Sequence, residues 1–116
     1  MIGERDVKPI KPPIVTLTDG QPVYPDHREL KPNGQQRDYV VLSTEERAKG
    51  FVRPVRSSYI HEKCGGETRM AASLAETYAR SPDFYSGTFC CGCRAHFPVG
   101  KNGEFVWSGT NIKVGT

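Results

Sequence analysis

One pattern of histidine and cysteine residues restricts this sequence more than any other feature. His61 and Cys64 are separated by two residues, 25 residues then follow, and Cys90 and Cys93 are again separated by two. Two residues with this spacing can hold one ion from a single tight turn, and a tetrahedral zinc ion needs four nitrogen or sulfur ligands. We therefore expect one Zn²⁺ per chain, bound by His61, Cys64, Cys90 and Cys93.

Glycines accompany both expected turns. Gly65 and Gly66 follow Cys64, and Gly92 precedes Cys93. Turns that curl around a sulfur need a positive φ at a late position, which glycine adopts without steric strain. Three thiolates and one neutral imidazole would leave no ligand position for water, so such a site is expected to stabilise the fold and not to catalyse.

Two neighbouring residues leave alternatives open. His96 stands three residues after Cys93 and could replace His61 as the fourth ligand. We prefer His61, because two ligands from each of two turns is the commoner arrangement and His96 should already be leaving along a strand. Cys91 lies between two ligands, so its side chain should point away from the metal as a half-buried thiol without a role.

The Cys90-x-x-Cys93 spacing is also that of dithiol oxidoreductases. Those enzymes place the motif at a helix N-terminus, which lowers the pKa of the nucleophilic thiol. Here the motif is followed by "RAHFPVG", with Pro98 in a strand-like run and no helix expected. Nucleophile motifs, glycine-rich phosphate loops and paired metal-binding carboxylates are missing as well. We therefore expect a protein that is not an enzyme.

Size and composition explain why a metal would matter. The chain has 116 residues, of which 36% are apolar. A single domain of this size with a small core often depends on a metal or on a partner subunit, which includes another copy of the chain. Residues 1–15 mix charges and prolines where a secretory signal would be apolar. We expect reduced cysteines, an intracellular origin and no membrane span.

The first third of the chain differs in character from the rest. Because proline removes a backbone donor and keeps the preceding residue extended, neither a helix nor a central strand is expected there. We expect residues 1–37 to form an extended arm without its own core, and residues 38–116 to form a zinc-binding α+β domain. The prolines in question are Pro9, Pro12, Pro13, Pro22, Pro25 and Pro32.

Local patterns predict the elements of that domain. Ser43 and Glu46 have the spacing of a capping box at the start of a short helix. An apolar stripe at helical spacing, made of Ala71, Leu74, Ala75 and Tyr78, predicts the main helix. The turn pair Asn102-Gly103 predicts a hairpin. The expected ranges are a strand at 38–43, a helix at 44–49, an extended segment at 51–60, the main helix at 69–80 and a β-hairpin at 96–107.

A basic stretch makes nucleic-acid binding the less favoured alternative. Between residues 47 and 69 there are six cationic side chains against two acidic ones, which gives six minus two, or +4. A basic stripe can bind phosphates, but a few arginines more often form a solvated face. The cations are Arg47, Lys49, Arg53, Arg56, Lys63 and Arg69, and the acids are Glu62 and Glu67.

The run "YIHEKCGGETRM … LAETYARSPDFYSGTFCCGCRAHFPV … EFVW" resembles small, mostly uncharacterised zinc-binding proteins of tailed bacteriophages and prophages. The resemblance covers residues 38–116. It implies a zinc-ribbon-like or treble-clef-like fold and a phage setting. We therefore expect a non-enzymatic accessory protein of the virion, decorating the capsid or stabilising the head. It would be made in the host cytoplasm and bind other virion proteins, of the capsid, neck or tail, through residues 1–37. The alternative is a regulator that binds nucleic acid or a host protein.

Overall fold

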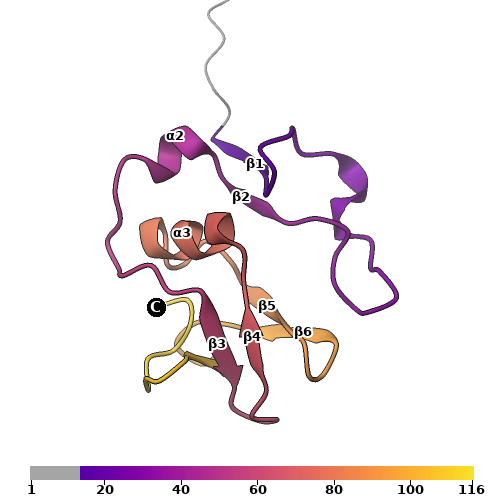
Figure 1. Cartoon of the computed structure of the whole chain (residues 1–116), viewed down its shortest axis with the longest axis vertical. Helices are drawn as coiled ribbons and strands as arrows, with labels where there is room; N and C mark the ends of the chain where they lie inside the picture. Colours follow the sequence, from indigo (N-terminus) through magenta and orange to yellow (C-terminus); the bar gives the residue numbers. More distant parts are fainter. Residues whose placement is uncertain (1–13) are drawn as a thin grey trace, which may run out of the picture.

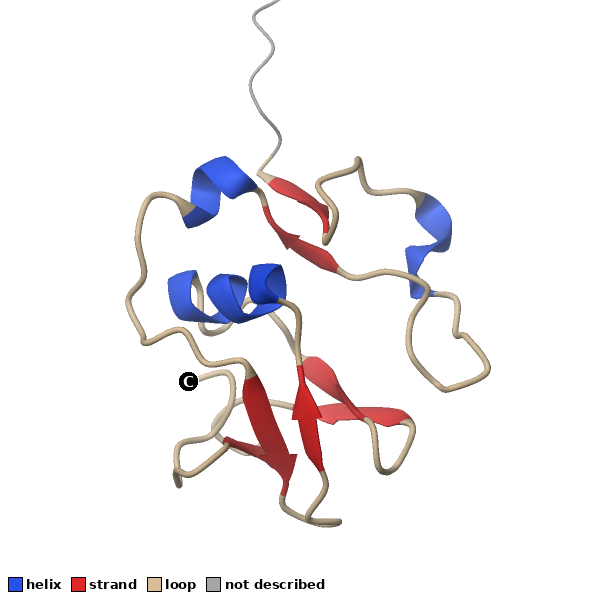
Figure 2. Ribbon diagram, viewed as in Figure 1, coloured by secondary structure: helices blue, strands red, loops and turns tan. Residues whose placement is uncertain are grey.

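The computed structural model describes residues 14–116, where three small antiparallel sheets and two α-helices form a small α+β domain (Figures 1 and 2). Short strands and one main helix agree with the predicted fold class. In chain order the elements are β1 (Val15–Leu17), the 3-10 helix η1 (Pro25–Arg28), β2 (Val40–Leu42), α2 (Thr44–Arg47), β3 (Ser58–His61), β4 (Glu67–Arg69), α3 (Ala72–Arg80), β5 (Gly87–Cys90), β6 (Ala95–Pro98) and β7 (Phe105–Trp107).

Strand β3 is the centre of the largest sheet, whose order is β4-β3-β7. Successive strand residues point to opposite faces, and here Tyr59 and His61 are the two buried ones. Tyr59 lies opposite Trp107 of β7, and His61 lies opposite Phe105. The register thus places the predicted histidine ligand in the interior.

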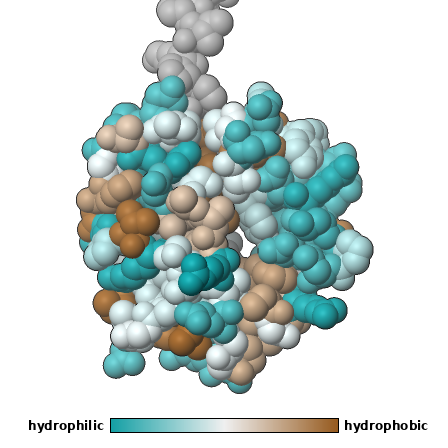
Figure 3. Space-filling view, in the orientation of Figure 1, coloured by the Kyte–Doolittle hydropathy of each residue, from teal (hydrophilic) through white to brown (hydrophobic). Residues whose placement is uncertain are grey.

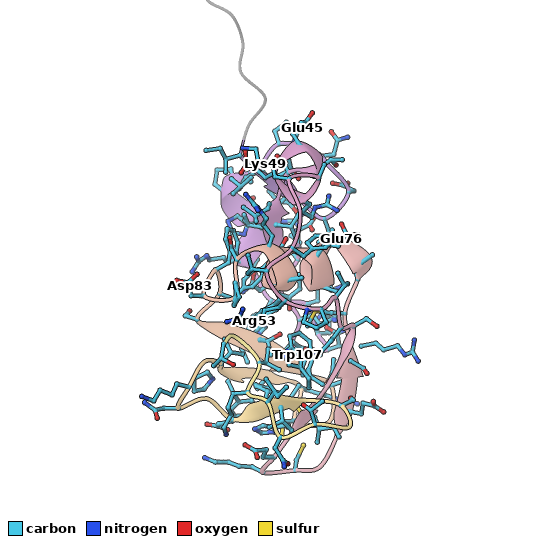
Figure 4. The ribbon with its side chains drawn as sticks, turned by 90° about the vertical axis from the view of Figure 1, so that its left-hand side faces the viewer. Glu45, Lys49, Arg53, Glu76, Asp83 and Trp107 are labelled. Atoms are coloured by element: carbon cyan, nitrogen blue, oxygen red, sulfur yellow. The ribbon has the colours of Figure 1, made fainter. Side chains whose placement is uncertain are left out.

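The core is mostly aromatic and includes a cysteine. Tyr59 packs edge-on against Phe105 and Trp107, with ring centroids 5.2 and 6.4 Å apart. Edge-to-face contacts of this kind add to the gain from burial. Trp107 lies below α3, as Figure 4 shows. The buried cluster is Tyr59, Tyr78, Cys90, Phe105, Trp107 and Val114.

The main helix starts later than predicted. Residues 67–69 form β4, which pairs with β3, so α3 begins at Ala72 and not at residue 69. Tyr78 of the predicted stripe is buried, whereas Leu74 is half-buried. Thr77, which the apolar stripe does not include, is fully buried. Its burial is tolerated because its hydroxyl accepts from the Leu42 N–H and donates to the Ser73 carbonyl. Thr77 thereby joins α3 to β2.

The strand at 38–43 and the short helix after it are found close to where they are predicted. Strand β2 spans Val40–Leu42, and the Ser43 hydroxyl caps α2 by accepting from the Glu46 N–H at 3.2 Å. Glu45 and Lys49 lie at the outer surface around α2 (Figure 4).

The described part of the expected arm differs from a free extension. Residues 15–17 pair antiparallel with residues 40–42, and Leu17 is buried. The "VTL" run of β1 and the "VVL" run of β2 are both rich in β-branched and apolar residues, which favours their pairing as strands. Residues 18–37 continue across to the β5–β6 ribbon, where Gly34 meets the backbone of Arg94. Residues 1–13 of the expected arm lie outside the described residues.

The predicted hairpin at 96–107 is wrong. Strand β6 pairs with β5, and β7 pairs with β3, so the two halves of the expected hairpin belong to different sheets. The connecting loop turns at Gly100, with φ of 102°, and packs tightly at Gly103, where a Cβ atom would lie 2.5 Å from Val99 Cα. This loop carries the chain from the β5–β6 ribbon to the three-stranded sheet.

Candidate metal centre

Two β-hairpin turns supply the predicted ligands. His61 is the last residue of β3, and Cys64 lies in the turn that leads to β4. Cys90 is the last residue of β5, and Cys93 lies in the turn that leads to β6. Each turn therefore offers one ligand from a strand end and one from the turn itself.

The two turns have matching backbone hydrogen bonds. The Gly65 N–H donates to the His61 carbonyl, and the Arg94 N–H donates to the Cys90 carbonyl, both at 2.7 Å. Two backbone amides also point at sulfur: the Gly66 N–H lies 3.3 Å from Cys64 Sγ, and the Cys93 N–H lies 3.4 Å from Cys90 Sγ. Such amides stabilise a thiolate.

The residue with positive φ follows the second ligand in each turn. These residues are Gly65 (φ 76°) and Arg94 (φ 58°), so Gly92 does not have the expected role. The turns approach each other at Gly92, but a Cβ atom there would make only ordinary van der Waals contacts, 3.5 Å from Cys64 Sγ and 4.0 Å from Gly66 Cα.

The structure brings the four predicted ligands into one cluster. The ligand atoms of His61, Cys64, Cys90 and Cys93 all lie within 4.8 Å of one another. Two pairs are closer, Cys64 Sγ to Cys90 Sγ and Cys93 Sγ to His61 Nδ1, each at 3.5 Å. Metal–sulfur bonds of about 2.3 Å in a tetrahedron would separate the ligand atoms by about 3.8 Å. The cluster could therefore hold one metal ion after small movements of the side chains.

Glu104 fixes which nitrogen of His61 faces the cluster. Nε2 of His61 donates to Glu104 Oε1 at 2.8 Å, which leaves Nδ1 for a metal. The ring is 2% exposed and stacks on Phe97, with centroids 4.5 Å apart. The hydrogen bond to His61 is the main cause that lowers the pKa of Glu104. A carboxylate behind a metal-binding histidine is a common arrangement, because it orients the ring and raises its basicity.

The thiols do not ionise equally without a cation. The Gly66 amide, followed by the His61 side chain, lowers the pKa of Cys64 to about 7. Burial, followed by the neighbouring cysteines, raises the pKa of Cys93 to about 11. Without a cation, ionisation of one thiol is favoured and ionisation of a further thiol is opposed. A divalent cation at the centre would favour ionisation of all three thiols.

The two residues left open in the sequence lie outside the cluster. Nε2 of His96 shares a hydrogen bond with the Tyr39 hydroxyl at 2.8 Å, and its ring faces Phe89. The Cys91 thiol points away from the cluster as expected, but it is exposed and not half-buried, and it donates to the Glu67 carbonyl. The dithiol motif itself lies in a turn between two strands and not at the start of a helix.

Sequence reasoning missed Glu104. It lies 43 residues from His61, and the two meet only because β7 pairs with β3. No local pattern around a single glutamate indicates this contact.

No protein-family model, curated protein or solved structure matches this chain. In the part of the chain from residue 14 onward, every helix is too short or too polar to cross a membrane.

Proposed function

We propose that the chain binds one zinc ion through His61, Cys64, Cys90 and Cys93, in a zinc-ribbon-like arrangement of two hairpin turns. Three sulfurs and one imidazole nitrogen are donors that suit zinc, whereas magnesium and calcium prefer oxygen. The observation that carries this proposal is the convergence of all four ligand atoms from two turns with matching hydrogen bonds.

The role proposed for this zinc is structural. Four protein ligands complete a tetrahedron, so no position remains for a reacting water. His61 and Cys90 are also buried in the interior, where the metal would join the two hairpins.

Zinc content tests this part directly. Mass spectrometry of the intact protein under native conditions should show one zinc ion per chain, and denaturing conditions should remove it. A folded chain that contains no zinc after purification without chelators would contradict the proposal.

At the biological level, we propose a non-enzymatic accessory component of a tailed-phage particle. Its support is the resemblance of residues 38–116 to small zinc-binding proteins of tailed bacteriophages and prophages, together with exposed apolar side chains in the N-terminal third. From residue 14 to residue 37, the large apolar side chains that are exposed are Ile14, Val23 and Leu30. These side chains would add apolar contacts with neighbouring subunits.

The particle proposal is tested on purified virions of the phage that encodes the chain. Mass spectrometry should find the protein in many copies, and replacing Ile14, Val23 and Leu30 by serine should reduce its attachment while zinc content is kept. Absence of the protein from washed particles would contradict a virion role.

The regulator alternative has weaker support from the surface charges. Arg47 forms an ion pair with Glu76 at 2.7 Å, and Lys49 pairs with Glu46 at 2.7 Å. Lys63 also pairs with Glu104 at 3.5 Å, so three of the six cations of the basic stretch are partly neutralised. Salt-dependent binding to DNA or RNA would favour this alternative.

A further inference from the structure

A cavity of about 280 Å³ lies between the N-terminal segment and the zinc-site hairpins. Lys31 and residues 35–39 form one side, and parts of β3, β4, α3 and β5 form the other; none of the four proposed metal ligands lines it. Figure 3 shows a hollow near the middle of this face. At about 30 Å³ per water molecule the cavity would hold roughly nine waters, and it is near the lower size limit of small-molecule pockets.

The floor of the cavity contains a buried hydroxyl without a partner. Tyr78 is 3% exposed and lines the cavity, and its hydroxyl makes no hydrogen bond to the described residues. The nearby Thr88 hydroxyl is engaged with the hydroxyl of Tyr59, which also donates to the Phe89 carbonyl. Burial is the main cause that raises the pKa of Tyr78, so its hydroxyl stays protonated. The Thr88 hydroxyl is close enough to Tyr78 to oppose this rise in pKa, but the Tyr78 hydroxyl makes no hydrogen bond of good geometry to the described residues. A better-placed acceptor would satisfy this buried donor.

The walls are suited to a flat ring. Aromatic and apolar side chains line the same cavity as Tyr78, and aromatic faces bind planar groups by stacking. These wall residues are Tyr39, Tyr59, Met70, Leu74, Tyr85 and Phe89.

The mouth is positively charged. Lys31, Arg37 and Arg69 line the cavity together with one acid, Asp38. Arg37 is paired with Glu29, and the Asp38 carboxylate accepts from the Thr18 hydroxyl. Within residues 14–116 neither Lys31 nor Arg69 forms an ion pair. These two cations are therefore available to an anionic group at the entrance.

We propose that this cavity binds a mononucleotide, with the base between the aromatic walls and the phosphate at Lys31 and Arg69. A ring nitrogen or carbonyl of the base accepts the hydrogen bond from Tyr78. The phosphate receives charge-assisted hydrogen bonds, which are stronger than neutral ones. This site goes beyond the structural role proposed above. The nucleotide can be free or can be the end of a single strand.

Titration calorimetry on the zinc-loaded full chain tests the site. The probes are the four ribonucleoside 5′-monophosphates, the matching nucleosides and inorganic phosphate. At least one nucleotide should give saturable binding, and its nucleoside should bind at least about 10-fold more weakly because the ion pairs with the phosphate are lost. Phosphate alone should bind more weakly than the nucleotide.

Matched variants locate the binding. Tyr78→Phe keeps the ring and removes only the hydroxyl, so nucleotide affinity should fall about 3- to 10-fold through loss of one neutral hydrogen bond. Arg69→Gln should weaken binding of the nucleotide and leave binding of the nucleoside unchanged. The controls are Tyr24→Phe and Arg56→Gln, which lie outside the cavity and should not change binding.

Two results would overturn the proposal: no saturable binding of any of the four nucleotides, or saturable binding that neither Tyr78→Phe nor Arg69→Gln changes. A short single-stranded oligonucleotide separates the two sources of ligand. If it competes with the nucleotide and depends on Tyr78, the site binds a strand end; if it does not compete, the site binds the free nucleotide. Zinc content, measured in parallel, tests the proposed structural function independently of this result.

Discussion

His61 uses both ring nitrogens in the candidate metal centre, because Nδ1 faces Cys93 and Nε2 donates to Glu104. His61→Ala removes a ligand and leaves a buried space, so zinc per chain should fall well below one. The measurement is native mass spectrometry. His96→Ala and Cys91→Ser are the controls and should keep full zinc occupancy. Full occupancy in His61→Ala would show that the ligand assignment is wrong.

Glu104 has no direct contact with the metal ligands' sulfur atoms, yet it should affect metal affinity. Glu104→Gln replaces the charged acceptor for His61 by a neutral amide, which should weaken zinc binding by roughly 10- to 100-fold. Competition with a chelator of known affinity measures this change. Glu62→Gln is the matched control. Glu62 belongs to the turn that follows His61, but its carboxylate pairs with Lys113 and not with the His61 ring. Equal zinc affinity in the two variants would refute the role of Glu104.

Sequence spacing was sufficient to predict which four side chains converge, because each pair lies within one turn and the turn fixes their separation. The spacing could not reveal Glu104 or Thr77. Each of these acts through a partner that tertiary structure brings near, and neither partner lies in a local pattern. The prediction for Gly92 failed for a local reason: the positive φ falls one residue after the ligand, where Arg94 adopts it.

At the level of elements, the sequence predicted the type of most segments better than their pairing. The "VVL" run and the Ser43 cap were found because they are local signals. The hairpin at 96–107 was predicted from its turn residues and the apolar runs "HFPV" and "EFVW" that flank them. Pairing of β6 with β5 and of β7 with β3 depends on which apolar faces meet in the core, and a turn signal carries no information about that.

The contact between the N-terminal segment and the β5–β6 ribbon depends on Gly34. It has φ of 90°, and a Cβ atom there would lie 2.0 Å from the Arg94 carbonyl oxygen. Gly34→Ala should lower the free energy of unfolding by about 1–2 kcal/mol from backbone strain, with a further loss from the clash. Gly20→Ala is the matched control, since Gly20 has φ of 88° and no atom within 4 Å of its Cβ position. Chemical denaturation measures both, and an equal loss in the two variants would refute the contact.

At the level of the whole molecule, the candidate metal centre adjoins the hydrophobic core. Cys90 belongs to the same buried cluster as Phe105 and Trp107, and His61 stacks on Phe97 at its edge. Structural zinc contributes roughly 10–16 kcal/mol of apparent free energy, whereas whole domains are stable by about 5–15 kcal/mol. Removal of the metal should therefore unfold the domain and not merely loosen two turns.

Trp107 is a direct probe of this expectation, because it is the single tryptophan of the sequence and is 6% exposed. A strong zinc chelator should shift its fluorescence emission to longer wavelength and abolish the near-ultraviolet circular dichroism of the aromatic core. Added zinc should restore both signals, whereas magnesium should not, because the site offers sulfur and nitrogen in place of oxygen. Unchanged emission in a chain shown to contain no zinc would mean that the aromatic core is stable without the metal, and the metal would then fix only the geometry of the two turns.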